Sequence, residues 1–355
     1  MFDQLLKERA LPALMTDHQG RPVDTFDRWR ARRREIIDLL SREEYGFTPT
    51  SPDRVDGEIL SSENAYAGKA LQQRVSVSFD TPSGRFSFPF TLILPKNDKP
   101  LPVFVTIAFR RETPDRYLPA EEIVDRGYAI ATFCYLDVTA DGPELDGLAA
   151  MYPRDGEACW GKIGMWAFAA SRVLDYLQTR PEIDPARACV TGHSRLGKTA
   201  LWCGAQDERF SMVVSNDSGC SGAAITRLKA GERVKAITTN FPFWFCDKNR
   251  SWSDRESEMP FEQHMLLALI APRKLYVCSA VEDEWADPAS EFLACAAASE
   301  AWTVQRVPGL IADDLPTVDQ PLHEGGICYH VRSGGHFHSR TDWTWQMDCR
   351  DRYHV

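Results

Sequence analysis

The chain of 355 residues is 43% hydrophobic and 11% aromatic, which is enough apolar material to bury a large core in one or two domains. The net charge of −10 and the pI of about 5.4 exclude nucleic acid and anionic membranes as general partners, because phosphate groups are bound by basic surfaces. The first residues lack the apolar stretch of a signal peptide, and no run reaches the roughly 20 apolar residues of a membrane helix, so we expect a soluble, cytoplasmic protein.

The predicted elements begin with an amphipathic helix that Asp24 and Thr25 cap and that ends at Tyr45 and Gly46. Between residues 73 and 95, apolar and polar side chains alternate on either side of a Thr-Pro-Ser-Gly turn, which is the pattern of a β-hairpin. Further along, continuous apolar strands alternate with helices, as in a buried and mainly parallel sheet. We predict these strands near residues 101–109, 127–135, 187–191, 211–217, 274–280 and 329–331, and the helices near 160–180, 199–205, 261–270, 287–301 and 341–353.

This order of elements predicts an α/β fold, a three-layer αβα sandwich around a mainly parallel sheet with antiparallel N-terminal strands. We assign residues 1–70 to an N-terminal helical segment packed on the core and residues 71–355 to the main α/β domain, so that the chain forms a single domain overall. We expect it to be a monomer. Residues 303–327 have the composition of a long irregular loop, and loops of that length are usually functional.

The ten cysteines are scattered, form no C-x-x-C motif and mostly lie in apolar segments. Buried thiols behave as small hydrophobic groups, so we expect free, reduced cysteines in the core. His336 and His338 have no matching cluster of Cys, Asp or Glu beside them in the sequence, and we therefore expect neither a metal nor a cofactor.

One motif, Gly-His-Ser-Arg-Leu-Gly-Lys-Thr at residues 192–199, fits two patterns between a strand and a helix. It matches the phosphate-binding loop G-x-x-x-x-G-K-[ST], and it differs by one extra residue from the nucleophile elbow G-x-S-x-G. A nucleotide hydrolase carries its loop early in the domain, but at least four strands precede this one, and the strand before Asp217 is interrupted by a polar Ser-Asn pair. Nucleotide binding is therefore a remote alternative.

A serine hydrolase instead needs an acid and then a histidine after later strands, and Asp283 and His336 follow Ser194 in that order. These residues predict an α/β-hydrolase fold with Ser194 as nucleophile, His336 as base and Asp283 as the acid that orients it. The cations Arg195 and Lys198 lie at a helix start, where the helix dipole disfavours them, and this suggests an anionic ligand.

The stretch from Gly192 to Lys198 resembles the G-x-S-R-x-G-K motif of the glucuronoyl esterases, which cleave esters of (4-O-methyl)glucuronic acid on xylan. The resemblance covers most of residues 25–350. It extends through the segments DERF, SNDSGCSGAA, FPFWFC, HMLLALIAPRKLYVCSA, WADP and SGGH.

The resemblance implies that Ser194 is the nucleophile, His336 the base and Arg195 the stabiliser of the oxyanion. It also implies that Lys198 and Glu232 contact sugar hydroxyls and that Trp285 lines the sugar site. The substrate would be a small or oligosaccharide glucuronate ester.

The family places its acid after either of two strands, and this chain has Asp217 at one position and Asp283 at the other. Many relatives carry a glutamate at the position of Asp217, and the aspartate side chain is one methylene shorter. We therefore prefer Asp283 and keep Asp217 as the alternative acid.

Two features depart from the family pattern. Fungal relatives have a cysteine where this chain has His193, and many relatives are secreted whereas this chain shows no export signal. We therefore expect a bacterial-type member whose substrate is a small imported ester. A sugar O-acetyl esterase of the same fold is the main alternative.

Overall fold

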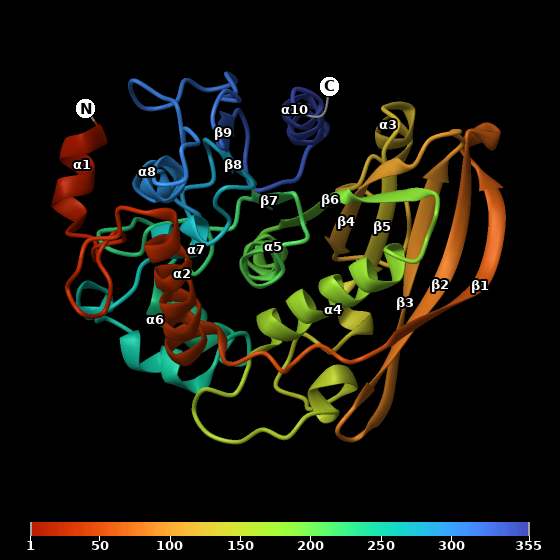
Figure 1. Ribbon diagram of the computed structural model, residues 1–355, viewed down its shortest axis with the longest axis horizontal. Coiled ribbons are helices and arrows are strands. Elements are labelled where there is room, and N and C mark those ends of the chain that lie inside the picture. The colour runs from red at the N-terminus through yellow and green to blue at the C-terminus, as the bar shows by residue number, and fades with distance from the viewer. Residues whose placement is uncertain (1, 354–355) are drawn as a thin grey trace.

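The computed structural model describes residues 2–353, which form one mixed sheet with helices on both faces (Figure 1). The strand order is β1-β2-β3-β5-β4-β6-β7-β8-β9. The strands β1 to β3 form antiparallel hairpins, β3 pairs antiparallel with β5, and the pairs from β5 to β9 are parallel. The strand bounds are β1 Val55–Ala65, β2 Ala70–Thr81, β3 Gly84–Pro95, β4 Leu101–Ala108, β5 Ala129–Cys134, β6 Ile183–His193, β7 Met212–Asn216, β8 Lys274–Ala280 and β9 Ile327–Arg332.

The helices begin where side chains satisfy the free backbone N–H groups of a first turn. Thr25 caps the helix after it, and Ser339 forms a reciprocal capping box with Asp342 at the start of the last helix. The helix bounds are α1 Phe2–Arg9, α2 Phe26–Leu40, α3 Ala120–Asp125, α4 Lys162–Leu177, α5 Arg195–Gln206, α6 Val234–Asn240, α7 Gln263–Ala268, α8 Pro288–Ala298, α9 Glu300–Thr303 and α10 Arg340–Asp351.

Alternate residues of each central strand point into two separate hydrophobic cores. In β4, Val103 and Val105 face the core shared with α4, α5 and α8, whereas Phe104 faces the core shared with α3 and α10. Figure 1 shows α3 and α10 on the opposite side of the sheet from α4 and α5. The predicted three-layer αβα sandwich with antiparallel N-terminal strands is therefore confirmed.

The predicted helical character of residues 1–70 is wrong for residues 55–65, which form the edge strand β1 and pair with β2. None of the eleven residues of β1 is buried, so the strand shows no alternation of apolar and polar side chains that the sequence would reveal. The sheet therefore begins before residue 70.

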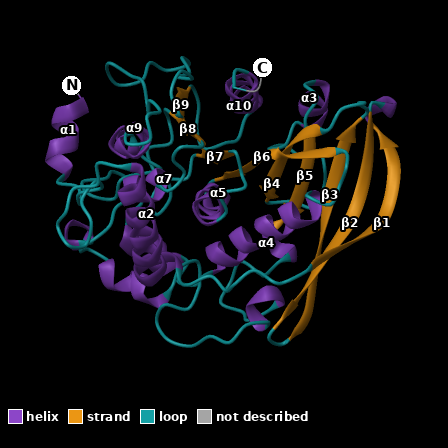
Figure 2. Cartoon of the chain, in the orientation of Figure 1, coloured by secondary structure: helices purple, strands orange, loops and turns teal. Residues whose placement is uncertain are grey.

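Residues 304–326 run between α9 and β9 as loop and turns, as predicted (Figure 2). Every cysteine except Cys159 is buried. Among residues 2–353, no helix is both long and apolar enough to cross a membrane.

Candidate active site

Four chemically reactive side chains follow four neighbouring parallel strands at their carboxyl ends. Ser194 follows β6, Asp217 follows β7, Asp283 follows β8 and His336 comes after β9. Ligand sites of open α/β sheets lie at this edge, because the connecting loops meet there. All four line one cleft of about 360 Å³, so the fold brings together residues that lie up to 142 positions apart.

Ser194 has the strained backbone of a nucleophile elbow. Its φ of 58° and ψ of −127° lie where non-glycine residues are rare, and its N–H donates to Asn216 O at 2.8 Å. A Cβ on Gly192 would lie 2.1 Å from Leu196 O, so the turn requires glycine there. Helix α5 begins directly at Arg195, as expected for a strand-to-helix elbow.

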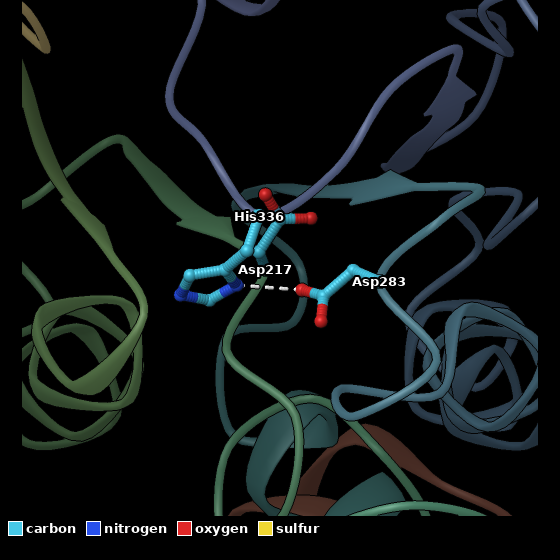
Figure 3. Close-up of side chains that lie close together, drawn as sticks. All are labelled: Asp217, Asp283 and His336. Atoms are coloured by element: carbon cyan, nitrogen blue, oxygen red, sulfur yellow. Dashed lines mark hydrogen bonds and ion pairs between the residues drawn. The ribbon is translucent and has the colours of Figure 1, made fainter.

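His336 is joined to Asp283, not to Asp217. The distance from His336 Nδ1 to Asp283 Oδ2 is 2.6 Å, and Figure 3 shows the ring turned toward that carboxylate. The His336 side chain is 45% exposed while that of Asp283 is 5% exposed, so the acid is covered and the ring reaches the cleft. This is the orientation in which a carboxylate fixes the tautomer of a catalytic imidazole.

Asp217 lies behind the His336 loop. Its Oδ2 accepts the N–H of Phe337 at 3.3 Å and lies 3.5 Å from Arg332 Nη2. Burial, together with the negative charges of Glu291 and Asp342, raises the pKa of the Asp217 carboxyl well above its usual range. A raised pKa makes Asp217 a poorer counter-charge for an imidazolium, and the 2.6 Å contact of His336 with Asp283 favours Asp283 as the acid.

Asp217, Asp283 and His336 also have donor atoms within 4.8 Å of one another, which is a set that a divalent cation can use. The environment disfavours that use, because the Arg332 guanidinium already places a positive charge 3.5 Å from Asp217. His336 Nδ1, in addition, is engaged with Asp283. The three groups fit a hydrolytic triad with a spare acid better than a metal centre.

His193, the residue before the nucleophile, packs against the base. The two ring centroids are 4.5 Å apart, and His193 Nδ1 lies 2.7 Å from Asn216 Oδ1. Burial lowers the pKa of His193 well below its usual value, and the neighbouring His336 adds to this effect. His193 is therefore neutral and supports His336 by packing without opposing its positive charge.

Arg332, which was not predicted from the sequence, holds the loop that carries His336. Its Nη1 donates to Ser333 O at 3.0 Å and its Nη2 donates to Gly335 O at 3.1 Å and to Phe337 O. Its Nε donates to the Asp342 carboxylate at 2.8 Å. The buried Arg332 guanidinium thus binds the backbone carbonyls of the residues before and after His336.

We expect Arg332→Ala to destabilise the protein by about 3 kcal/mol, because it leaves the buried Asp342 carboxylate and the partly buried carbonyls of the His336 loop without their donor. Thermal and urea unfolding measure this loss, and kcat should fall together with stability as the His336 loop loosens. Arg340→Ala is the control, since Arg340 pairs with Glu122 at the surface with its side chain 79% exposed. An equal loss in both variants would contradict the role of Arg332.

The other wall of the cleft contains the remaining predicted residues, Arg195, Lys198, Glu232 and Trp285. Lys198 Nζ donates to Ser218 O at 2.5 Å and lies 3.8 Å from Glu232 Oε2. Trp285 is 57% exposed, and its carbonyl accepts the Glu232 N–H at 3.0 Å. The fold thus ties the Glu232 segment to the tryptophan. Phe241 and Trp244 complete this wall and were not predicted from the sequence.

The two cations at the start of α5 each have a carboxylate nearby. Arg195 pairs with Asp141 and Lys198 lies beside Glu232. The prediction of an anionic ligand rested on the helix dipole, which disfavours cations at a helix start. The two carboxylates offset that cost, so the cations do not require an anionic ligand. An ester of a uronic acid carries no charge on its carboxyl group, so a compensated site suits it.

A strained serine at a strand-to-helix elbow and a His–Asp pair at the same sheet edge define a serine hydrolase of the α/β-hydrolase class. The comparisons with known proteins give the family. The family model for glucuronyl esterases of fungi matches residues 75–305.

A carbohydrate esterase from an unknown prokaryotic organism is 33% identical, with 96% of this chain and 88% of the relative covered. The 4-O-methyl-glucuronoyl methylesterase of Podospora anserina is 30% identical over 81% of this chain and 58% of its own length. The solved glucuronoyl esterase from Solibacter usitatus is 34% identical, has a TM-score of 0.91 and covers 97% of this chain and 98% of its own. The chain therefore belongs to the glucuronoyl esterase family, and the predicted resemblance is confirmed.

Proposed function

We propose that this protein hydrolyses esters of (4-O-methyl)glucuronic acid through an acyl-enzyme on Ser194. The observation that carries the proposal is the placement of Ser194 and the His336–Asp283 pair in one cleft whose other wall holds Arg195, Lys198, Glu232 and Trp285. The names of similar proteins support the substrate class, since they include 4-O-methyl-glucuronoyl methylesterases.

In the first half of the reaction, Ser194 Oγ attacks the ester carbonyl and His336 accepts the hydroxyl proton. Asp283 holds the Nδ1–H of the ring and stabilises the imidazolium that forms. His336 then gives its proton to the departing alkoxide, which leaves as the alcohol. Water, activated by the same ring, hydrolyses the acyl-enzyme to release the uronic acid and restore Ser194.

Negative charge on the carbonyl oxygen would be stabilised at the start of α5. Arg195 is the first residue of this helix, so its backbone N–H has no acceptor within the helix. Its guanidinium lines the same cleft. Backbone and side chain of one residue thus supply donors where the oxyanion develops.

We propose that Lys198, Glu232 and Trp285 hold the sugar. An ammonium and a carboxylate near one another offer a donor and an acceptor to neighbouring hydroxyl groups, and an exposed indole offers a face on which a sugar ring packs. In a glucuronate ester the sugar lies on the acid side of the scissile bond, whereas in a sugar acetate it lies on the alcohol side, so the two substrates would place their hydroxyl groups on opposite sides of the attacked carbonyl.

The direct test is a parallel assay on benzyl glucuronate, acetylated xylo-oligosaccharide and ATP. We expect turnover of the glucuronate ester with a kcat/KM far above that for the acetyl ester, and no hydrolysis of ATP. Preferred turnover of the acetylated oligosaccharide would instead establish the sugar O-acetyl esterase. Size-exclusion chromatography tests whether the protein is a monomer, as expected. The monomeric state and the cytoplasmic location both stay predictions.

Two substitutions separate charge stabilisation from sugar binding. We expect Arg195→Ala to lower kcat by about 10²-fold even on an ester without a sugar, because its donor acts on the charge of the transition state. Lys198→Ala should chiefly raise KM for benzyl glucuronate and leave simple esters unaffected. Steady-state kinetics on benzyl glucuronate and p-nitrophenyl acetate measure both effects. A uniform loss on every substrate after Lys198→Ala would contradict its role in sugar binding.

A further inference from the structure

The side chain of Arg195 is held in place by Asp141, a residue from the loop between β5 and α4. Arg195 Nη1 donates to Asp141 Oδ2, and the guanidinium carbon lies 4.7 Å from the ring centroid of Trp244. Among the partners found in residues 2–353, Arg195 Nε has no acceptor. One edge of the guanidinium is therefore fixed by a carboxylate and a tryptophan face, and its Nε–H is buried.

Asp141 is itself fixed by two further donors. The hydroxyl of Tyr135, which follows β5, donates to Asp141 Oδ2 at 3.0 Å, and Trp244 Nε1 donates to Oδ1 at 2.7 Å. The Asp141 side chain is only 12% exposed. A shielded carboxylate with three charged or polar donors has little freedom to rotate. Trp244 both lies against the guanidinium and orients its counter-ion.

The loop that carries Asp141 is closed by a buried lysine. Lys162 Nζ donates to Ala140 O at 2.6 Å and to Glu144 O at 2.8 Å, and its side chain is 2% exposed. Lys162 is the first residue of α4, where both burial and the helix dipole disfavour a cation. Asp146 Oδ1 accepts the Ala140 N–H at 2.9 Å and closes the same loop. These contacts make the loop a rigid support for Asp141.

We propose that Asp141 is a positioning residue for the hydrolysis, which holds the Arg195 guanidinium beside the developing oxyanion. The inference rests on the proposed function of Arg195. A free arginine samples many rotamers and would have to become ordered during the reaction, whereas a guanidinium that is already fixed stabilises the charge without that reorganisation. Asp141 acts on Arg195 directly and through Trp244, whose indole N–H it accepts and whose ring lies against the guanidinium.

A double-mutant cycle tests this coupling. Asp141→Ala should lower kcat about tenfold on both benzyl glucuronate and p-nitrophenyl acetate, while KM for the glucuronate ester stays within about twofold. When Arg195 is already replaced by alanine, the same Asp141 substitution should change kcat by less than about twofold, because the group that it positions is gone. Multiplicative losses in the double variant would overturn the proposal.

Asp137→Ala is the matched control. Asp137 lies on the same segment after β5, has a shielded carboxylate and pairs with Arg111 at 2.6 Å, and the contacts found in residues 2–353 do not join it to Arg195. We expect it to leave kcat within about twofold. A loss equal to that of Asp141→Ala would overturn the proposal, since removal of any nearby acid would then suffice.

The cycle also separates this inference from the proposed function. Lack of activity of the unaltered protein on benzyl glucuronate would refute the proposed function itself. An unchanged kcat after Arg195→Ala would overturn both the role of Arg195 and that of Asp141. A loss after Arg195→Ala that does not couple to Asp141 would overturn the positioning role alone and leave the esterase activity standing.

Discussion

Replacing Ser194 by alanine is expected to lower kcat for glucuronate esters by at least about 10⁴-fold, because the hydroxyl is a reactant that forms the acyl-enzyme. Assays on benzyl glucuronate measure the loss. Circular dichroism and thermal unfolding should show an unaltered fold, since alanine keeps the Cβ and the backbone conformation. Retained turnover would refute the proposed nucleophile.

The stability of Ser194→Gly, compared with that of Ser194→Ala, measures the backbone strain in the elbow. With φ at 58° and ψ at −127°, a residue with a Cβ is disfavoured by about 1–3 kcal/mol relative to glycine. The glycine variant should therefore be inactive like the alanine variant, but more stable by about 1 kcal/mol after the entropy of the unfolded glycine is subtracted. Equal stability of the two variants would show that the elbow stores no strain.

The central sheet could be predicted because its strands are buried on both faces. All six residues of β5 are buried, and such strands appear in the sequence as unbroken apolar runs. The edge strand β1 has no buried residue and therefore left no such signal. Its place in the sheet follows from pairing with β2, which is a contact that periodicity cannot show.

The order of reactive residues along the chain was also informative, because each lies in the loop that follows a strand of the parallel sheet. Asp141 and Arg332 gave no comparable signal. Asp141 meets Arg195 across 54 residues and Trp244 across 103 residues, and neither distance in sequence suggests contact. The substrate class came from the resemblance to a family, since the cleft residues alone fit several sugar esters.

The two acids should respond very differently to replacement by asparagine. Asp283→Asn should lower kcat by about 10³- to 10⁴-fold, because the amide neither compensates the imidazolium nor holds the Nδ1–H tautomer of His336. Asp217→Asn should lower kcat by less than about tenfold. The raised pKa of Asp217 favours a neutral carboxyl there, which asparagine resembles, and its amide oxygen can still accept the Phe337 N–H.

Kinetics on benzyl glucuronate, with thermal unfolding as a check on folding, measure both effects. The reverse ranking would assign the catalytic acid to Asp217. Two mild effects would show that the acids replace each other. Such replacement is sterically feasible, because donor atoms of both acids and of the His336 ring lie within 4.8 Å of one another. The double variant decides between these outcomes. If Asp283 alone supports His336, adding Asp217→Asn to Asp283→Asn changes kcat little, whereas a rescuing Asp217 would make the double loss far larger than either single loss.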